Sequence, residues 1–232
     1  MPIKNSIKQY RADSYYHLYN RGVEKRLIFL DDQDYSVFLS YLKTYLEPKD
    51  ELGLQSTLVD PSSSSKEKDK ALKLLRLNNF HDSIQLIAYI LMPNHFHFFV
   101  KQTELDSIDR FMNSLCTRFT MYFNKKYKRV GGLFQSVYKG VLVESEEQFI
   151  YLSRYIHRNI LGLKRKDDRD ARMLASYQTS SYPDYLGLRH TNWLHPEEVL
   201  KLFHDERAYQ AFVEDIDSEK SVKTLTQLTL DE

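Results

Sequence analysis

The sequence has little cysteine and no long apolar run, and both absences limit the kind of protein it encodes. With one cysteine, Cys116, the chain forms no internal disulfide and no cysteine-based zinc site. No stretch reaches the roughly 18 apolar residues of a membrane span. Residues 1–16 lack the apolar core of a signal peptide. We therefore expect a cytoplasmic protein in a reducing setting, without a membrane partner.

Acidic residues are missing from one long stretch of the chain. Between Arg110 and Val143 there are seven basic residues and no acidic one, whereas residues 196–232 hold ten acidic and four basic residues. The overall net charge is only +1. This asymmetry is compatible with a basic surface for a polyanion. An ordinary solvated helix end at Lys125–Arg129 is the other interpretation, and the sequence leaves both open.

The hydrophobic patterning predicts one α+β domain. The 232 residues, 42% of them hydrophobic, can build a substantial core. Period-2 and period-3.6 patterns predict a strand over 14–21, a helix to about residue 46, strands on both sides of Pro93, a helix over 105–127, a strand over 135–143 and a helix over 145–161. This order indicates a ferredoxin-like antiparallel sheet with helices packed on one face.

Other parts of the chain differ in composition from this domain. Residues 1–13 are polar, and we expect them to be flexible. The serine- and charge-rich stretch 49–80 predicts a flexible insertion with a short helix over 68–77. Residues 163–232 are expected to form an irregular appendage with two short helices, over 196–203 and 208–216. The predicted domain therefore spans residues 14–162.

The segment from Leu86 to Lys101, LIAYILMPNHFHFFVK, contains the strongest candidate site. Residues two apart on a strand lie about 6.6 Å apart on one face. His95 and His97 should therefore project side by side, while Phe96 and Phe98 face the other way. Two such imidazoles are half of a metal site. An isolated His-x-His is more often a feature of an ordinary strand.

The helix predicted after Ser145 carries a second candidate group. Tyr151, Tyr155 and Asn159 are spaced four apart and form one row beside the apolar stripe. A tyrosine can act as a nucleophile, and a carboxamide oxygen can complete a site for a hard metal ion. Spacing alone favours a core or hydrogen-bonding tyrosine, because the chain contains 17 tyrosines.

Several ordered segments resemble one known family. LMPNHFHFFV is similar to the histidine hairpin of single-tyrosine HUH transposases of the insertion-sequence-200-like type, and RYIHRN resembles the helix with their nucleophilic tyrosine. YYHLYNRGVEKRLIFLDDQDYSVFL and GLFQSVYKGVLVES add to the match. SSYPDYLG and NWLHPEEVLKLFHDERAYQAFV resemble the C-terminal part of the REP-associated tyrosine transposases. The resemblance covers residues 14–216, apart from the insertion.

The resemblance implies an activity and a set of site residues. Tyr155 would be the nucleophile, and His95, His97 and Asn159 would bind Mg²⁺ or Mn²⁺. The reaction would be cleavage and rejoining of single-stranded DNA, at hairpin elements of the REP type, through a 5′-phosphotyrosine. The protein would associate with the nucleoid when bound to DNA, as a monomer or a homodimer. The expected DNA-binding residues are His17, Arg21, Arg118, Lys125, Lys126, Arg129, Arg154 and Arg158.

Two other functions are compatible with parts of the pattern. A non-catalytic nucleic-acid-binding module of ferredoxin-like fold could stack bases on Phe96 and Phe98. A metallohydrolase could use His95 and His97, but the following segment, FFVKQTELDSIDR, offers no further histidine at ligand spacing. Metal independence and indifference to Tyr155→Phe would distinguish the binding module.

Overall fold

Alternating side chains along four strands build one antiparallel sheet with two buried faces. The computed structural model describes residues 10–162 and 179–215. The strands are β1 (Ser14–Arg21), β2 (Ile84–Met92), β3 (His95–Gln102) and β4 (Lys139–Leu142), in the order β2-β3-β1-β4. All neighbouring pairs are antiparallel. The predicted α+β, ferredoxin-like sheet is therefore confirmed.

Two helices cover the first face of the sheet. They are α1 (Asp32–Leu46), which begins at an Asp31 N-cap, and α4 (Ser107–Lys126). Phe96 and Phe98 point into this layer and pack around Phe38 of α1, and all three rings are fully buried. The rings of Phe38, Phe96 and Phe98 thus anchor α1 on this face of the sheet.

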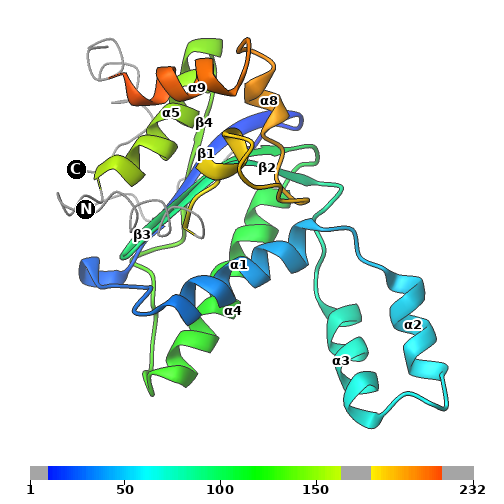
Figure 1. Cartoon of the computed structure of the whole chain (residues 1–232). Helices are drawn as coiled ribbons and strands as arrows, with labels where there is room; N and C mark the ends of the chain where they lie inside the picture. Colours follow the sequence, from blue (N-terminus) through cyan, green and yellow to red (C-terminus); the bar gives the residue numbers. More distant parts are fainter. Residues whose placement is uncertain (1–9, 163–178, 216–232) are drawn as a thin grey trace.

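The second face is covered by α5 (Glu146–Gly162) and by residues 179–215. The C-terminal helices are α7 (Tyr182–Tyr185), α8 (Glu197–Leu200) and α9 (Glu206–Glu214). Phe149, Leu152 and Ile156 of α5 pack with Phe99 of β3 in a separate cluster. Figure 1 shows α1 and α4 on one side of the sheet and α5 on the other. The expectation that the helices pack on one face is corrected, because α5 also has an apolar stripe to bury.

The C-terminal appendage also covers the outer edge of β2. Ser180 forms an antiparallel bridge with Ile90, and Leu194 forms a parallel bridge with Leu86. Tyr185 donates a hydrogen bond to the carbonyl oxygen of Ile87 at 2.9 Å. Residues 179–215 are thus packed onto the domain. The helix expected over 196–203 is present in shorter form as α8, the one expected over 208–216 is α9 and begins two residues earlier, and α7 was not predicted.

The insertion is helical rather than irregular along most of its described length. It contains α2 (Glu51–Val59) and α3 (Ser65–Arg76), which pack against each other. Ser64 and Glu67 form a capping box at the start of α3. In Figure 1 the pair projects away from the sheet. The helix expected over 68–77 is confirmed with an earlier start, and α2, which precedes it, was not predicted.

Two further local elements depart from the expectations. The strand predicted over 135–143 is only the four residues of β4, preceded by a single bridge from Phe134 to Gly22. A 3₁₀ turn, η1 (Val23–Lys25), follows β1. None of the helices in residues 10–162 and 179–215 has the length and apolar character needed to cross a membrane.

Candidate active site

Strands β1 and β3 bring three histidines together on the second face of the sheet. His95 and His97 alternate with the buried phenylalanines, as the spacing predicts, and their ring centroids are 5.0 Å apart. His17 of β1 joins them: its Nε2 lies 2.9 Å from Nδ1 of His97, and the two rings stack. Both rings are buried. His17, His95 and His97 therefore form one cluster of contacting imidazole rings.

Helix α5 places Tyr155 over this cluster. The apolar residues Leu152 and Ile156 fix the helix on the sheet, so the adjacent row faces the histidines. The ring of Tyr155 lies edge-on to His97 with centroids 5.4 Å apart, and 6.0 Å from His17. Because both groups belong to the same chain, the phenol and the imidazoles meet within one copy of the protein.

The neighbouring members of the α5 row lie differently. Asn159 is half-buried, and its amide nitrogen donates to the carbonyl oxygen of Tyr155 at 2.9 Å. Within the described residues, Asn159 makes no direct hydrogen bond to His95 or His97. Tyr151 packs against Phe212 of α9 with centroids 5.7 Å apart. Tyr155 is therefore the member of the row that contacts the histidine cluster.

Both candidate ligand histidines are held in the neutral form. Burial and the charge of Arg21 lower the pKa of His95 to about 4. Burial, with the neighbouring His17 and His95, lowers the pKa of His97 well below its ordinary value. Neutral imidazole is the form that binds metal ions. The pair is thus ready to act as ligands at neutral pH.

The predicted ligand set of His95, His97 and Asn159 would suit a hard or borderline divalent ion. Two imidazole nitrogens and one carboxamide oxygen fit Mn²⁺, and fit Mg²⁺ less closely. No group of three or more histidine, cysteine, aspartate or glutamate side chains that could hold a metal occurs in the described part of the chain. A third ligand would have to come from a different residue type, and Asn159 is one turn from Tyr155.

Strand β1 contributes Arg21 and His17, which differ in their exposure to solvent. Arg21 pairs with His95 across β1 and β3, and its charge acts on that histidine. His17, by contrast, is fully buried and bonded to His97. Tyr19 stacks on both His17 and His97, and sequence analysis did not identify it. Its position two residues after His17 on the same strand was the signal that could have found it.

Helix α4 lies on the opposite face of the sheet from Tyr155. The Arg118 guanidinium stacks on Tyr41, 3.8 Å from its centroid. Lys126 donates to Asp31 at 2.7 Å and to the buried Asp34 at 2.8 Å. Lys125 is exposed. Of these basic residues, Lys125 has the position of a surface contact, while Lys126 ties α4 to α1.

The other basic candidates are also partly committed to internal contacts. Arg129 donates to Asn124 at 3.1 Å. Arg154 is 2% exposed, donates to the carbonyl oxygen of Asp215 and lies over Phe212. It therefore points towards α9 rather than towards the histidines. Arg158, one turn later, is half-buried.

His157 joins α5 to the C-terminal appendage. Its ring is fully buried, with Nδ1 2.6 Å from Tyr209 Oη and Nε2 2.8 Å from Ser181 Oγ. Ser181 in turn accepts from the backbone nitrogen of Tyr89 on β2. The appendage thus covers His157 and keeps it from solvent. This chain of contacts holds α5, and hence Tyr155, against the sheet.

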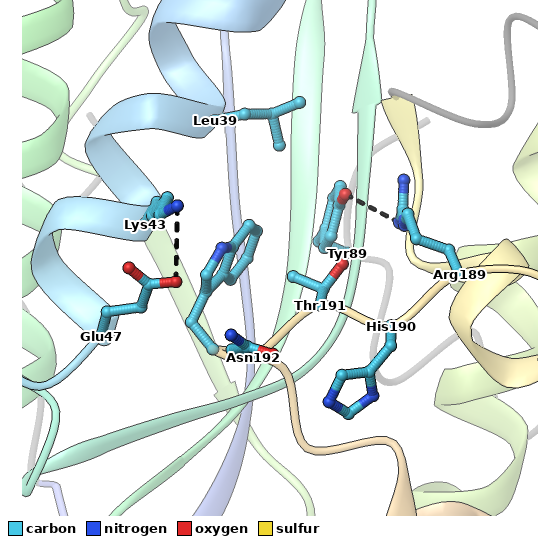
Figure 2. Close-up of a pocket in the computed structure, with 9 residues that line it drawn as sticks. Leu39, Lys43, Glu47, Tyr89, Arg189, His190, Thr191 and Asn192 are labelled. Carbon is cyan, nitrogen blue, oxygen red and sulfur yellow. Dashed lines mark hydrogen bonds and ion pairs between the residues drawn. The ribbon is translucent and has the colours of Figure 1, made fainter.

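A separate shallow pocket lies on the other face of the sheet. It has a volume of about 400 Å³ and is lined by α1 and residues 189–193. Figure 2 shows Arg189 bonded to Tyr89 and Lys43 facing Glu47. Arg189 also pairs with Asp184, which offsets its charge. The pocket is thus a junction between α1 and the appendage, separate from the histidine cluster.

Comparison with known proteins supports the resemblance seen in the sequence. Residues 64–159 match the family model of IS200-like transposases, and this range contains His95, His97, Tyr155 and Asn159. The match agrees with the suspected family over this region and supports a transposase function. Nothing among the curated proteins matches the chain.

The fold is similar to that of a REP-associated tyrosine transposase bound to a REP hairpin. That structure has a TM-score of 0.50 and 10% identity, with coverage of 81% of this chain and 89% of the other. At this identity the likeness shows the fold alone.

Two further solved structures have lower TM-scores. A protein from Deinococcus radiodurans R1 described as a transposase has a TM-score of 0.28 and 18% identity, over 66% of this chain and 96% of the other. The tRNA(His) guanylyltransferase of Saccharomyces cerevisiae has a TM-score of 0.32 and 11% identity, over 96% of this chain and 80% of the other.

Proposed function

We propose that this protein cleaves and rejoins single-stranded DNA, with Tyr155 as the nucleophile. The observation that carries the proposal is the contact between Tyr155 and His97 at 5.4 Å between ring centroids, within one chain. A catalytic phenol must lie beside the groups that bind the phosphate, and this arrangement provides that proximity. The family match over the same residues supports it.

The reaction conserves the phosphodiester energy. The Tyr155 oxygen attacks phosphorus and forms a 5′-phosphotyrosine, and the bond between phosphorus and the 3′ oxygen breaks. The phenol proton passes overall to the leaving 3′ oxygen, which becomes a hydroxyl. Attack by a 3′-hydroxyl of another strand reverses the step and joins the two strands.

The site must also make a weak nucleophile effective, because a free tyrosine has a pKa near 10. A divalent ion, Mg²⁺ or Mn²⁺, held by His95, His97 and Asn159 would polarise the phosphate. Tyr19, stacked beside His97, and the apolar residues of α5 keep the cluster in place. Arg21, next to His95, would hold a neighbouring phosphate.

The substrate is proposed to be single-stranded DNA beside a hairpin. The REP-associated transposase of similar fold was solved with a REP hairpin. Arg21, Lys125 and Arg158 are the predicted basic residues whose positions best allow contact with DNA. Because Tyr155 meets the histidines of its own chain, a single copy would contain a whole active site.

The competing binding-module function has less support. It requires Phe96 and Phe98 to stack on bases, yet both rings have no exposed surface and lie in the α1–α4 core. A base could reach neither ring without displacing α1. The cleavage proposal uses the opposite, polar face of the same strand.

Covalent capture of DNA tests the proposal directly. The protein is incubated with hairpin-flanked single-stranded DNA and Mn²⁺, and adducts are separated on a denaturing gel. We expect an adduct with the wild type and with Tyr151→Phe, and none with Tyr155→Phe. Tyr151 is the matched control because it lies one turn away on α5 and contacts Phe212. An adduct that persists in Tyr155→Phe would contradict the proposal.

A further inference from the structure

The turn between β2 and β3 contains an asparagine that contacts a candidate ligand directly. Asn94 Oδ1 lies 2.6 Å from Nδ1 of His95. A carboxamide oxygen only accepts, so His95 must carry its proton on Nδ1 in this contact. The neutral ring then has its lone pair on Nε2. This is the arrangement in which a histidine binds a metal through Nε2 while its other nitrogen donates to a supporting group.

The orientation of the Asn94 amide is itself fixed. Its nitrogen donates to the backbone carbonyl of Lys25 at 3.3 Å. An amide flipped by half a turn would place its oxygen against that carbonyl and its NH₂ group against His95. The Lys25 carbonyl therefore selects which end of the amide faces the imidazole.

Lys25 presents this carbonyl from a strained turn. Glu24 and Lys25 both have positive φ, 57° and 58°, a conformation that costs about 1 kcal/mol or more per non-glycine residue. The turn is tied to the hairpin by backbone bonds from Gly22 to Asn94 and from Ile28 to Pro93, both 2.8 Å. These backbone hydrogen bonds stabilise the strained conformation of Glu24 and Lys25.

We propose that Asn94 is a positioning residue that sets the tautomer of His95, and that the η1 turn fixes Asn94 for this role. The inference extends the proposed metal-dependent function, since a defined tautomer matters only if His95 binds a metal. The inference gives a structural reason for the positive φ angles of Glu24 and Lys25, which place the Lys25 carbonyl against Asn94. The partial burial of His95 supports it, because burial disfavours the doubly protonated ring and leaves the two neutral tautomers.

The test compares ring nitrogens in metal-free protein with ¹⁵N-labelled histidine. We expect His95 of the wild type to show a protonated Nδ1 and an unprotonated Nε2. Asn94→Ala should give a mixture of the two tautomers, whereas Asn94→Asp, which keeps an acceptor oxygen, should retain the wild-type pattern. Lys25→Gly keeps the carbonyl and tolerates positive φ, so it should also retain the pattern. Asn78→Ala, remote from the site and bonded to Ser114, is the control.

Mn²⁺ affinity is measured on the same variants. Asn94→Ala should weaken binding by about 10–100-fold and Asn94→Asp should largely restore it. A proton on Nε2 of His95 in the wild type, or an unchanged tautomer in Asn94→Ala, would overturn the inference. If the wild type shows the expected tautomer but binds no Mn²⁺, the metal role in the proposed function fails on its own.

Discussion

Nε2 of His17 lies 2.9 Å from Nδ1 of His97, and the two stacked rings are buried together. If His97 binds a metal through Nε2, its Nδ1 carries the proton and donates to His17. His17 must then accept through Nε2. The first strand therefore supports the second ligand histidine in the way that Asn94 supports the first.

Removing this acceptor should weaken metal binding. We expect His17→Phe to lower Mn²⁺ affinity by about 10–100-fold and His17→Gln, which retains an acceptor, to lower it less. Isothermal titration measures both. His81→Phe is the control, since His81 bonds to the carbonyl oxygen of Leu46, away from the cluster. Unchanged affinity in His17→Phe would show that the contact does not support a metal ligand.

Substitution of the adjacent residues Lys125 and Lys126 should affect different properties, DNA binding for Lys125 and stability for Lys126. Lys126 bonds to Asp34, which has no exposed surface, so Lys126→Met should reduce the free energy of unfolding by about 2 kcal/mol. Lys125 is exposed, and Lys125→Met should leave stability unchanged while reducing the slope of log affinity against log salt by about 0.7 for single-stranded DNA. Urea unfolding and salt-dependent binding measure the two effects. An unchanged salt dependence in Lys125→Met would show that Lys125 of α4 does not contact DNA.

Stability should fall in mild acid because of His157. Burial, with the charge of Arg189, lowers the pKa of His157 from 6.5 to about 3. Below the unfolded pKa only the unfolded chain takes up this proton, so the free energy of unfolding falls as pH drops from 6.5 towards 3. Above that window the contribution is complete.

Urea unfolding at about pH 7 and about pH 4.5 tests this dependence. We expect His157→Gln to be less stable at neutral pH and to lose less stability on acidification than the wild type. His204→Gln is the control, because its side chain is 93% exposed. Equal acid sensitivity in the wild type and His157→Gln would contradict the prediction.

The α2–α3 pair should be dispensable for folding. The two helices pack on each other, and Lys49 donates to the Leu77 carbonyl at 2.7 Å, so the ends of the insertion lie together. Replacing residues 50–77 with a short Gly-Ser linker should change the unfolding midpoint by only a few degrees, because closing a shorter loop costs about 1 kcal/mol or less. Calorimetry measures it. Failure to fold would show that the pair is part of the core.

The local sequence pattern predicted the side-chain directions on β3 correctly. Alternation on β3 separates His95 and His97 from Phe96 and Phe98, and the structure agrees. The apolar stripe on α5 also predicted that the row of Tyr151, Tyr155 and Asn159 borders the sheet, and the family resemblance singled out Tyr155 within that row. Period and burial are local properties, so a single segment contains enough information for both.

The incorrect sequence predictions concern residues whose contacts come from segments distant in the sequence. Arg154 and His157 are on the predicted helix, but their burial depends on α9 and residues 180–185, which are distant in sequence. Lys126 is basic in sequence and neutralised in space by Asp31 and Asp34. The serine-rich stretch concealed a capping box, since Ser64 is an excellent N-cap as well as a loop residue. Such pairings require the tertiary structure.

The bridges from Ser180 and Leu194 to β2 also affect how copies of this protein behave in a crowded cell. An open strand edge invites pairing with a neighbouring chain and leads to aggregates. Here the appendage occupies the margin of β2, and the opposite margin is a strand of only four residues. Both edges of the sheet that supports α5 are therefore protected from pairing with strands of other chains.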